Sequence, residues 1–531
     1  MEININTTNE EKGSATLVGN ATPIQFNSGL TITNLGNAVN HYVDRDAVKN
    51  KIQVECADGA LDVIAKTLEK VISRDDKVFY DPAMGLISLG SDGKKHPIDR
   101  TKLQFIAMRH ADFVVFGGDE FKKINCPLAV CDALLSFDEW PLIKPLMGIT
   151  KSSLLLPDGR FIDKPGYDEE TGIYALQHGC YPHIASPVSK HEAMNALYHL
   201  FDLLHEFPFN SPEDASAAMS MLISALLRPV MQTCPLTLIN ASNKGSGKTT
   251  LAQVFSIIAQ EKSSGVTAWS GKSEELEKRL FGLAKSGSPF LLFDNLMNDI
   301  DDKDGVLSAY VTGGEMTSRT LGSSEVVTAK ANAFMVATGN NINAQADMAR
   351  RTITIRLTPN VDNPENRHFE RDILAFTQYN RDLIVKYILT VVKGWFDNGC
   401  YIPDDLPKAG SFPDWERLAR FPLLWLDQPD PWAVVSRSKE IDPDIIAFDA
   451  FLKTAIESFG VYKSFSVDCI ISNAKTAAVV PDQFKQLGTV NSRQLGKWLI
   501  SKIDAINAGY KLIRSPIKTG GKTWYQVAPI Q

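Results

Sequence analysis

The segment Leu236–Thr250, LTLINASNKGSGKTT, places a run of β-forming residues directly before a glycine-containing loop and a helical pattern. This order constrains the fold, because a phosphate-binding loop needs a strand before it and a helix N-terminus after it. Backbone N–H groups of such a loop and of the helix point at phosphate oxygens. The sequence therefore predicts an α/β core with a nucleotide site at the end of this strand.

Within this loop, we expect the Lys248 ammonium to reach the β- and γ-phosphates and the Thr249 hydroxyl to bind Mg²⁺. The full pattern has a glycine at position 242, where this chain has Ser242, and Gly245 can relieve the turn instead. The predicted nucleotide contacts are Asn243, Lys244, Gly245, Ser246, Gly247, Lys248, Thr249 and Thr250.

An acidic motif follows at Pro289–Asn295, PFLLFDN, where a hydrophobic run ends in Asp294. A carboxylate at the carboxyl end of a buried strand can hold the Mg²⁺ water shell beside the γ-phosphate. A core strand that ends in a turn aspartate is the alternative, but the position after a GKT helix favours the metal role. We therefore predict Thr249 and Asp294 as the Mg²⁺ ligands and ATP as the nucleotide.

Two further motifs follow in chain order. The segment Ala331–Asn340 predicts a buried strand whose last residue, Asn340, can touch the γ-phosphate or orient the attacking water. Arg350 and Arg351 precede the alternating segment Thr352–Leu357, and an arginine there can project into the site of a neighbouring subunit. A pair of surface arginines is the alternative interpretation.

The segment Met316–Lys330 predicts a β-hairpin that turns at Gly322–Ser324 and carries Arg319 and Lys330 on its arms. A basic hairpin at this point can reach into the central channel of a ring and contact a DNA backbone. A structural hairpin with solvated charges fits the sequence equally well.

Composition limits the class of protein. The chain has 531 residues and a formal net charge of −7, so any surface that binds nucleic acid must be local. The longest apolar stretch, near Ala217–Leu227, is too short to cross a bilayer, and the polar start MEININTTNEEKGS does not resemble a signal peptide. We therefore expect a cytoplasmic protein with no membrane contact. The seven scattered cysteines form no CxxC pair and are expected to be reduced.

Upstream of the loop, residues 1–45 lack helical periodicity and are expected to form a loose arm, whereas residues 46–190 have mixed α/β patterns without a catalytic constellation. In the helical connector 191–234, the second helix begins with Ser211 at the N-cap and Pro212 in the first turn. Other predicted elements are helices at Leu61–Ile72, Ile98–Met108 and His191–Glu206, and strands at Val78–Leu89 and Val266–Trp269.

Residues 359–441 are predicted to be helical and to pack on the ATPase core, and residues 442–531 to form a separate unit. Its helices at Asp442–Phe459, Ser466–Thr476 and Asn491–Ile503, followed by two strands, are typical of a winged helix. From residue 485 onward this unit has eight basic residues and one acidic residue, which is the electrostatic signature of nucleic-acid binding. A winged helix that contacts protein is the alternative. The predicted DNA contacts are Arg319, Lys330, Arg493, Lys497, Lys511, Arg514, Lys518 and Lys522.

The chain resembles superfamily 3 helicases in the order of its motifs, which are GSGKTT, LLFDN, TGN and an arginine pair before a β-run. A basic hairpin lies between the second and third of these motifs, as it does in that family. The chain is especially similar to the helicase halves of primase–helicase proteins of phages, prophages and other mobile elements. The segments PDGRFIDKPGYDEETG, RTLGSSE and ATGNN extend the resemblance, which covers roughly residues 60–531 and leaves out the primase half. The resemblance implies an AAA+ core that assembles as a ring, usually a homohexamer, and translocates on DNA, with a separate primase as a candidate partner.

Carried over by motif, the resemblance implies that Lys248 and Thr249 bind phosphate and Mg²⁺. It makes Asp294 the acidic metal partner and Asn340 the sensor. Arg351 matches the arginine finger, because it directly precedes the β-run, and Arg350 is the second choice.

One position departs from the pattern. Many AAA+ proteins follow the acidic motif aspartate with a glutamate that polarises water, whereas this chain has Asn295. Either Asp294 does both jobs or another carboxylate, such as Glu315, contributes.

The sequence thus predicts an α/β fold with an AAA+ P-loop ATPase core, an α/β N-terminal domain, helical segments and a C-terminal winged helix. The favoured function is that of an ATP-dependent DNA helicase or translocase in replication of a mobile element. The alternatives are a DNA-binding loader or remodelling ATPase without unwinding activity and an inert prophage relic, which the intact motifs disfavour. The predicted domains are 1–45, 46–190, 191–234, 235–358, 359–441 and 442–531.

Overall fold

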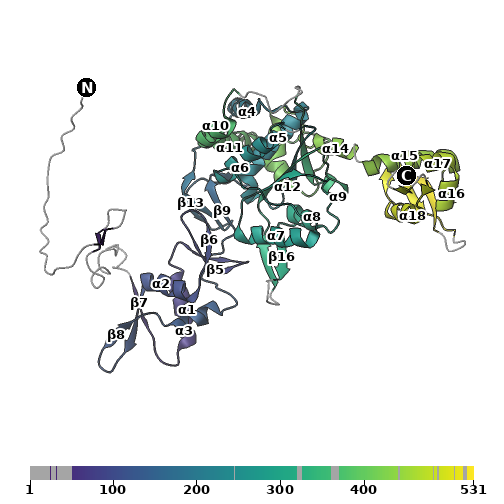
Figure 1. Cartoon of the computed structure of the whole chain (residues 1–531). Helices are drawn as coiled ribbons and strands as arrows, with labels where there is room; N and C mark the ends of the chain where they lie inside the picture. Colours follow the sequence, from purple (N-terminus) through teal and green to yellow (C-terminus); the bar gives the residue numbers. More distant parts are fainter. Residues whose placement is uncertain are drawn as a thin grey trace, which may run out of the picture. The chain divides into compact units, whose positions relative to one another are not determined.

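The computed structural model describes residues 51–243, 245–319, 326–359, 370–440, 443–481, 484–486, 489–507, 509–517 and 523–530. It also describes two short paired strands, β1 (Ile24–Gln25) and β2 (Thr31–Ile32), within the predicted arm, whose other residues lie outside the described ones. The chain divides into two compact units (Figure 1), one from residues 1–78 and 98–143 and the other from residues 79–97 and 144–531.

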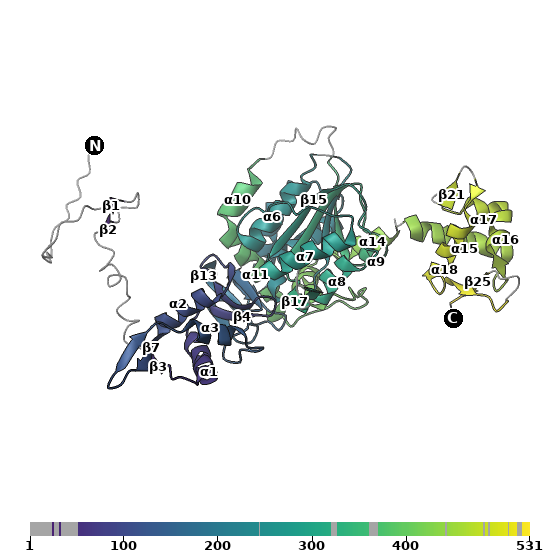
Figure 2. The same cartoon turned by 60° about the horizontal axis from the view of Figure 1, so that its bottom comes forward.

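The first unit combines a three-stranded sheet with helices (Figure 2). Its elements are β3 (Ile52–Glu55), α1 (Leu61–Ile72), α2 (Arg100–His110), β7 (Ala111–Phe116), β8 (Phe121–Ile124) and α3 (Leu128–Leu135). Strand β7 pairs in parallel with β3 and antiparallel with β8. Helix α1 has the predicted bounds because apolar residues at helical spacing, such as Leu68 and Ile72, are buried on one face.

The second unit begins with small sheets that precede the helical connector. The strands are β4 (Val78–Asp81), β5 (Gly85–Leu89), β6 (Lys95–Pro97), β9 (Gly148–Ser152), β10 (Leu154–Leu155), β11 (Phe161–Ile162), β12 (Gly166–Asp168) and β13 (Ile173–Cys180). Strands β4 and β5 confirm the predicted pair around the turn at Asp81–Gly85, where Gly85 has a φ of 72°.

Four parallel strands form the central sheet of this unit (Figure 2). They are β14 (Leu236–Ala241), β15 (Phe290–Leu296), β18 (Phe334–Asn340) and β19 (Thr352–Leu357), in the spatial order β15-β18-β14-β19. All residues of β14 are buried, as expected for a parallel strand covered on both faces. Because the strands are parallel, their carboxyl ends meet at one edge of the sheet.

The predicted strand at Val266–Trp269 is wrong, because residues 263–270 adopt no regular secondary structure. The Thr267 N–H donates to the Leu292 carbonyl of β15 at 2.7 Å, and no ladder of bonds continues from it. Val266 is 61% exposed, whereas the Trp269 ring lies 5.2 Å from the Phe293 ring of β15, so one ring contact and one hydrogen bond hold the segment at the sheet edge without a strand ladder.

Helices surround the central sheet and complete the second unit's core. They are α4 (Lys190–Leu204), α5 (Pro212–Leu227), η3 (Arg228–Val230), α6 (Lys248–Gln260), α7 (Ser273–Ser286), α8 (Val306–Gly313), α9 (Ala346–Ala349), α10 (Ile373–Tyr379) and α11 (Arg381–Asp397). The predicted N-cap of α5 is confirmed, because the Ser211 hydroxyl accepts from the Asp214 N–H. Among the described residues, no helix is long and apolar enough to cross a membrane.

The buried Arg381 anchors the helix that follows the phosphate loop. Its guanidinium donates to the carbonyls of Ile257 (2.9 Å) and Ile258 (2.8 Å) in the last turn of α6. It also donates to the Ser152 hydroxyl (2.8 Å) and pairs with Glu261 (3.4 Å). Helix α11 therefore supplies a cation at the negative end of the α6 dipole.

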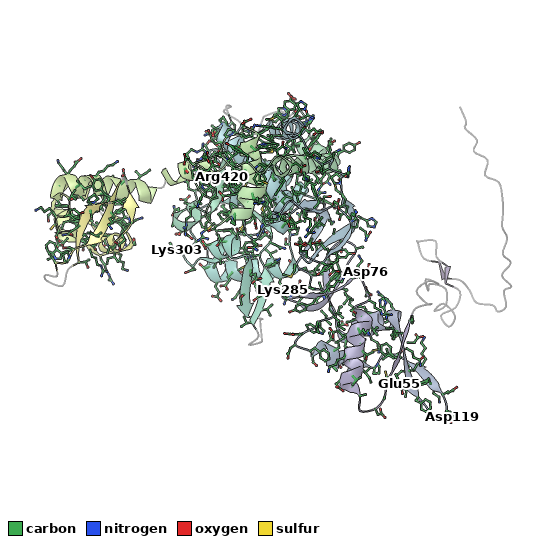
Figure 3. The ribbon with its side chains drawn as sticks, turned by 180° about the vertical axis from the view of Figure 1, so that it is seen from behind. Glu55, Asp76, Asp119, Lys285, Lys303 and Arg420 are labelled. Carbon is green, nitrogen blue, oxygen red and sulfur yellow. The ribbon has the colours of Figure 1, made fainter. Side chains whose placement is uncertain are left out.

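The tryptophan-rich segment packs into the same core as the sheet, as predicted. Its elements are α12 (Pro413–Trp415), η5 (Glu416–Arg420), α13 (Phe421–Trp425) and α14 (Ala433–Glu440). Arg420 (Figure 3) is fully buried and binds Asp430 through two hydrogen bonds of 2.8 and 2.7 Å. This paired charge is compatible with burial because both partners are satisfied.

The C-terminal residues form a separate hydrophobic core that includes Phe451, Trp498 and Leu512. The elements are α15 (Pro443–Phe459), β20 (Phe465–Ser466), α16 (Val467–Ser472), α17 (Ala474–Ala478), β21 (Lys485–Gln486), β22 (Thr489–Val490), α18 (Ser492–Ser501), β23 (Ile506–Asn507), β24 (Tyr510–Arg514) and β25 (Trp524–Pro529). The four-stranded sheet has the order β20-β25-β24-β23.

The predicted single helix Ser466–Thr476 is wrong. Ser466 caps α16 as expected, but Asn473 has an extended backbone and its side chain accepts from the N–H groups of Lys475 and Thr476. A new helix, α17, therefore begins there, because an asparagine at this position caps a helix better than it continues one. The predicted N-cap Asp442 lies outside the described residues.

Candidate nucleotide site

The loop after β14 needs glycine at two positions. Gly245 and Gly247 have φ angles of 75° and 90°, in the left-handed region, whereas Ser242 is not among the residues with positive φ. Gly245 therefore supplies a left-handed residue three positions after the first glycine of the sequence pattern. Gly247 is the N-cap of α6, and a Cβ there would lie 3.5 Å from the Phe207 ring. Lys244 lies outside the described residues.

Lys248 is the first residue of α6 and is 8% exposed. Its ammonium donates to the Asn340 side-chain oxygen at 2.6 Å and to the Asn243 carbonyl at 3.2 Å. Burial lowers the pKa of Lys248, and the nearby Asp294 carboxylate partly opposes this shift. The fold thus brings the loop lysine to the end of β18.

Asp294 lies at the end of β15 and faces the first turn of α6. Its Oδ1 accepts hydrogen bonds from the Thr249 hydroxyl (2.9 Å) and the Thr338 hydroxyl (2.6 Å). No described residue donates to its Oδ2. The following residue, Asn295, has a φ of 56°, a conformation that asparagine tolerates better than most residues.

The structure therefore brings Lys248, Thr249, Asp294 and Asn340 to one edge of the sheet. Three neighbouring strands, β14, β15 and β18, deliver them there because their carboxyl ends coincide. Thr338 also belongs to this group, although we did not select it from the sequence. Its signal was a hydroxyl near the end of a mostly apolar strand, two residues before Asn340 and therefore on the same face of the strand.

The two candidate arginines differ in their surroundings. Arg351 is 15% exposed, pairs with Asp347 at 2.8 Å and donates to the Thr312 hydroxyl at 2.7 Å. Arg350 is 60% exposed and pairs only with Asp347, at 2.5 Å, among the described residues. Burial raises the pKa of Asp347, but the two arginines outweigh this effect and lower it overall. Arg350 is therefore the more exposed of the two arginines, and Arg351 is the more firmly held.

The predicted hairpin is confirmed by β16 (Glu315–Arg319) and β17 (Val326–Lys330), which pair antiparallel. Lys330 faces Glu315 at its base, where a pocket is also lined by Asp81, Lys95 and Lys285 (Lys285 is labelled in Figure 3). Burial lowers the pKa of Lys330. The tip, and the side chain of Arg319, lie outside what the structure describes.

The predicted basic residues of the C-terminal unit lie mainly at its surface. Arg493 and Lys497 are exposed one turn apart on α18, Arg514 is exposed at the end of β24 and Lys511 is half-buried on that strand. Lys518 and Lys522 lie outside the described residues.

Comparisons with known proteins give distant structural neighbours. No protein-family model and no curated protein sequence matches this chain. The apo structure of the NrS-1 C-terminal region has 12% identity and a TM-score of 0.37, and the match covers 87% of this chain and 99% of that chain. The X-ray structure of JCV helicase has 11% identity and a TM-score of 0.19, and the match covers 48% of this chain and 74% of that chain.

Proposed function

We propose that this chain is an ATP-dependent DNA helicase or translocase. The observation that carries the proposal is the convergence of Lys248, Thr249, Asp294 and Asn340 at the carboxyl ends of adjacent parallel strands. Phosphoryl-transfer sites share the same parts, namely a loop lysine and hydroxyl, an opposing carboxylate and a polar residue on the next strand. The assignment of the core to the AAA+ class is part of this proposal.

The residues present fit a nucleotide and a magnesium ion. The N-terminus of α6 offers backbone N–H groups to phosphate, and the oxygens of Thr249 and Asp294, 2.9 Å apart, are hard ligands suited to Mg²⁺. Across the described segments, no group of three or more His, Cys, Asp or Glu side chains gathers into a metal cluster. Such a site suits an ion that completes its shell with phosphate and water oxygens. When bound, the ion would neutralise charge on the transferred phosphoryl group.

The chain's own residues have separable tasks. Lys248 would turn from Asn340 to phosphate oxygens, because a charged ammonium binds an anionic oxygen more strongly than a neutral amide oxygen. Asn340, freed from this contact, can then orient the attacking water. The Asp294 Oδ2, which receives no hydrogen bond from the described residues, can accept a proton from that water. We therefore favour Asp294 in both roles over Glu315, whose cross-strand partner is Lys330 at the hairpin base.

Ring assembly and DNA contact complete the proposal. Arg350, the more exposed arginine, would enter the site of a neighbouring subunit in a homohexamer. The hairpin of β16 and β17 and the exposed Arg493 and Lys497 would contact DNA phosphates, with the C-terminal unit acting as a winged helix. A mobile-element context and a separate primase partner are further expectations of the proposal.

The test is ATP hydrolysis with and without single-stranded DNA, measured beside fork unwinding. Lys248→Ala should abolish hydrolysis and the thermal stabilisation by ATP with Mg²⁺, whereas Lys262→Ala, at an exposed position just after α6, should change neither. Retained hydrolysis in Lys248→Ala would refute the proposed site.

A loader or remodelling ATPase is the second outcome of the same experiment. DNA-stimulated hydrolysis with strand separation supports the helicase, and hydrolysis without separation supports the loader. Truncation near residue 441 adds a second comparison, because a helicase should keep DNA-stimulated hydrolysis and a recruiter should lose it.

A further inference from the structure

Strands β15 and β18 change register where the acidic motif ends. Phe293 is opposite Ala337 and Leu296 is opposite Gly339, so two residues, Asp294 and Asn295, face the single residue between those partners. Two residues opposite one define a β-bulge, and bulges next to functional sites commonly redirect a side chain. The residue opposite the bulge is Thr338.

Thr338 connects to both residues of the bulge. Its hydroxyl accepts from the Asn295 N–H at 2.8 Å and donates to Asp294 Oδ1 at 2.6 Å. Thr338 is 1% exposed, so water cannot readily replace these bonds. A hydroxyl can donate one hydrogen bond and accept two. The Thr338 hydroxyl thus accepts from the Asn295 N–H, which the bulge leaves without a partner in the strand ladder, and at the same time fixes the Asp294 carboxylate.

The same carboxylate oxygen also receives the Thr249 hydroxyl at 2.9 Å. Thr249 is a predicted ligand of the metal ion, which its oxygen would bind through a lone pair while the O–H still donates to Asp294. Thr338 is thus the second donor to Asp294 Oδ1, and unlike Thr249 it has no predicted contact with the metal ion.

We propose that Thr338 is a positioning residue for hydrolysis, which acts by fixing the rotation of the Asp294 carboxylate and the bulge at Asn295. This inference rests on the proposed function and deepens it. It also gives a physical reason for asparagine at position 295: its backbone N–H is committed to Thr338 in a left-handed conformation that a β-branched residue would adopt only with strain.

The test compares Thr338→Val, which removes the hydroxyl at nearly constant volume, with Thr338→Ser, which keeps it. Groups that orient a metal ligand typically contribute 10- to 100-fold in activity or metal affinity. We expect Thr338→Val to lower kcat by about 10- to 100-fold with KM for ATP within about threefold, and Thr338→Ser to stay within about threefold of wild type.

A matched control lies in the same sheet. Thr237 on β14 is fully buried, and its hydroxyl has no hydrogen-bond partner among the described residues, so Thr237→Val removes a buried strand hydroxyl without breaking a described bond. We expect this variant to keep wild-type kcat. Binding of a fluorescent ATP analogue at increasing Mg²⁺ gives a readout apart from turnover, and Thr338→Val should need about tenfold more Mg²⁺ for half-maximal binding.

The outcomes separate the two proposals. An active wild type with unchanged kcat and Mg²⁺ dependence in Thr338→Val overturns the role of Thr338 and leaves the proposed function intact. Equal losses in Thr338→Val and Thr338→Ser also overturn it, since the hydroxyl would then not be the cause. A wild type without ATP hydrolysis overturns both.

Discussion

Replacing Arg350 with alanine should remove most ATP hydrolysis and leave the fold stable, whereas Arg351→Ala should chiefly destabilise the core. Arg350 is 60% exposed and its ion pair with Asp347 spans a single helical turn, so losing it should cost at most about 1 kcal/mol. Arg351 is 15% exposed and donates to the Thr312 hydroxyl at 2.7 Å. Hydrogen bonds from charged groups contribute about 1.5–3 kcal/mol each, so with its ion pair Arg351→Ala should cost about 2–4 kcal/mol.

The expected effect of Arg350→Ala on hydrolysis is larger and of different origin. An arginine supplied by a neighbouring subunit contributes roughly 10³–10⁵ in rate, which corresponds to roughly 4–7 kcal/mol of activation free energy. Thermal unfolding, ATP hydrolysis and ATP binding are measured on both variants. Arg350→Ala should bind ATP nearly like wild type, because the proposed trans arginine acts on the charge that develops in the transition state.

Mixing variants provides the decisive assay. Arg350→Ala subunits keep Lys248, and Lys248→Ala subunits keep Arg350, so a mixed ring contains sites with both residues intact. When the two variants are mixed in equal amounts and assemble at random, roughly a quarter of the sites should combine an intact Lys248 with a neighbour's intact Arg350. If the mixture assembles and stays inactive, or if Arg350→Ala alone hydrolyses ATP normally, the role of Arg350 is refuted. If Arg351→Ala is as stable as wild type, the structural role of Arg351 is refuted.

Three further predictions concern charge. Burial lowers the pKa of Lys248, and phosphate binding needs the charged form, so ATP affinity should be full near neutral pH and fall as pH rises through a value below the ordinary lysine pKa of about 10.4. A titration of the ATP dissociation constant against pH should show this fall. A dissociation constant that stays unchanged up to the ordinary lysine pKa would contradict the prediction. Arg381→Met should destabilise the second unit by about 3–5 kcal/mol in thermal unfolding, because it leaves buried acceptors in α6 unpaired. Glu261→Gln should cost under about 1 kcal/mol, because that partner of Arg381 is partly exposed. Equal losses of stability in the two variants would contradict this prediction. Arg493→Ala with Lys497→Ala should weaken DNA binding and lower the slope of log affinity against log salt by about 2, and an unchanged slope would show that α18 does not meet phosphate.

Local sequence signals predicted the elements around the site well. The strand, glycine loop and helix from Leu236 onward, the cap at Ser211 and the hairpin arms all depend on residues within a few positions of one another. Backbone conformational preference and hydrogen bonds to neighbouring N–H groups act over that range, so the sequence alone carries the information. The prediction of a strand at Val266–Trp269 was wrong, because a strand there needs a ladder of hydrogen bonds to β15, and local sequence preference does not encode that pairing.

The sequence by itself determined which chemical groups this protein has and where the phosphate loop begins. Only the tertiary structure decided how those groups meet. It placed Lys248 against Asn340, put Thr338 opposite the bulge at Asp294, and partly buried Arg351 while leaving its neighbour exposed. These outcomes depend on strand order, register and packing between segments far apart in the chain, and no pattern within a single segment encodes such distances.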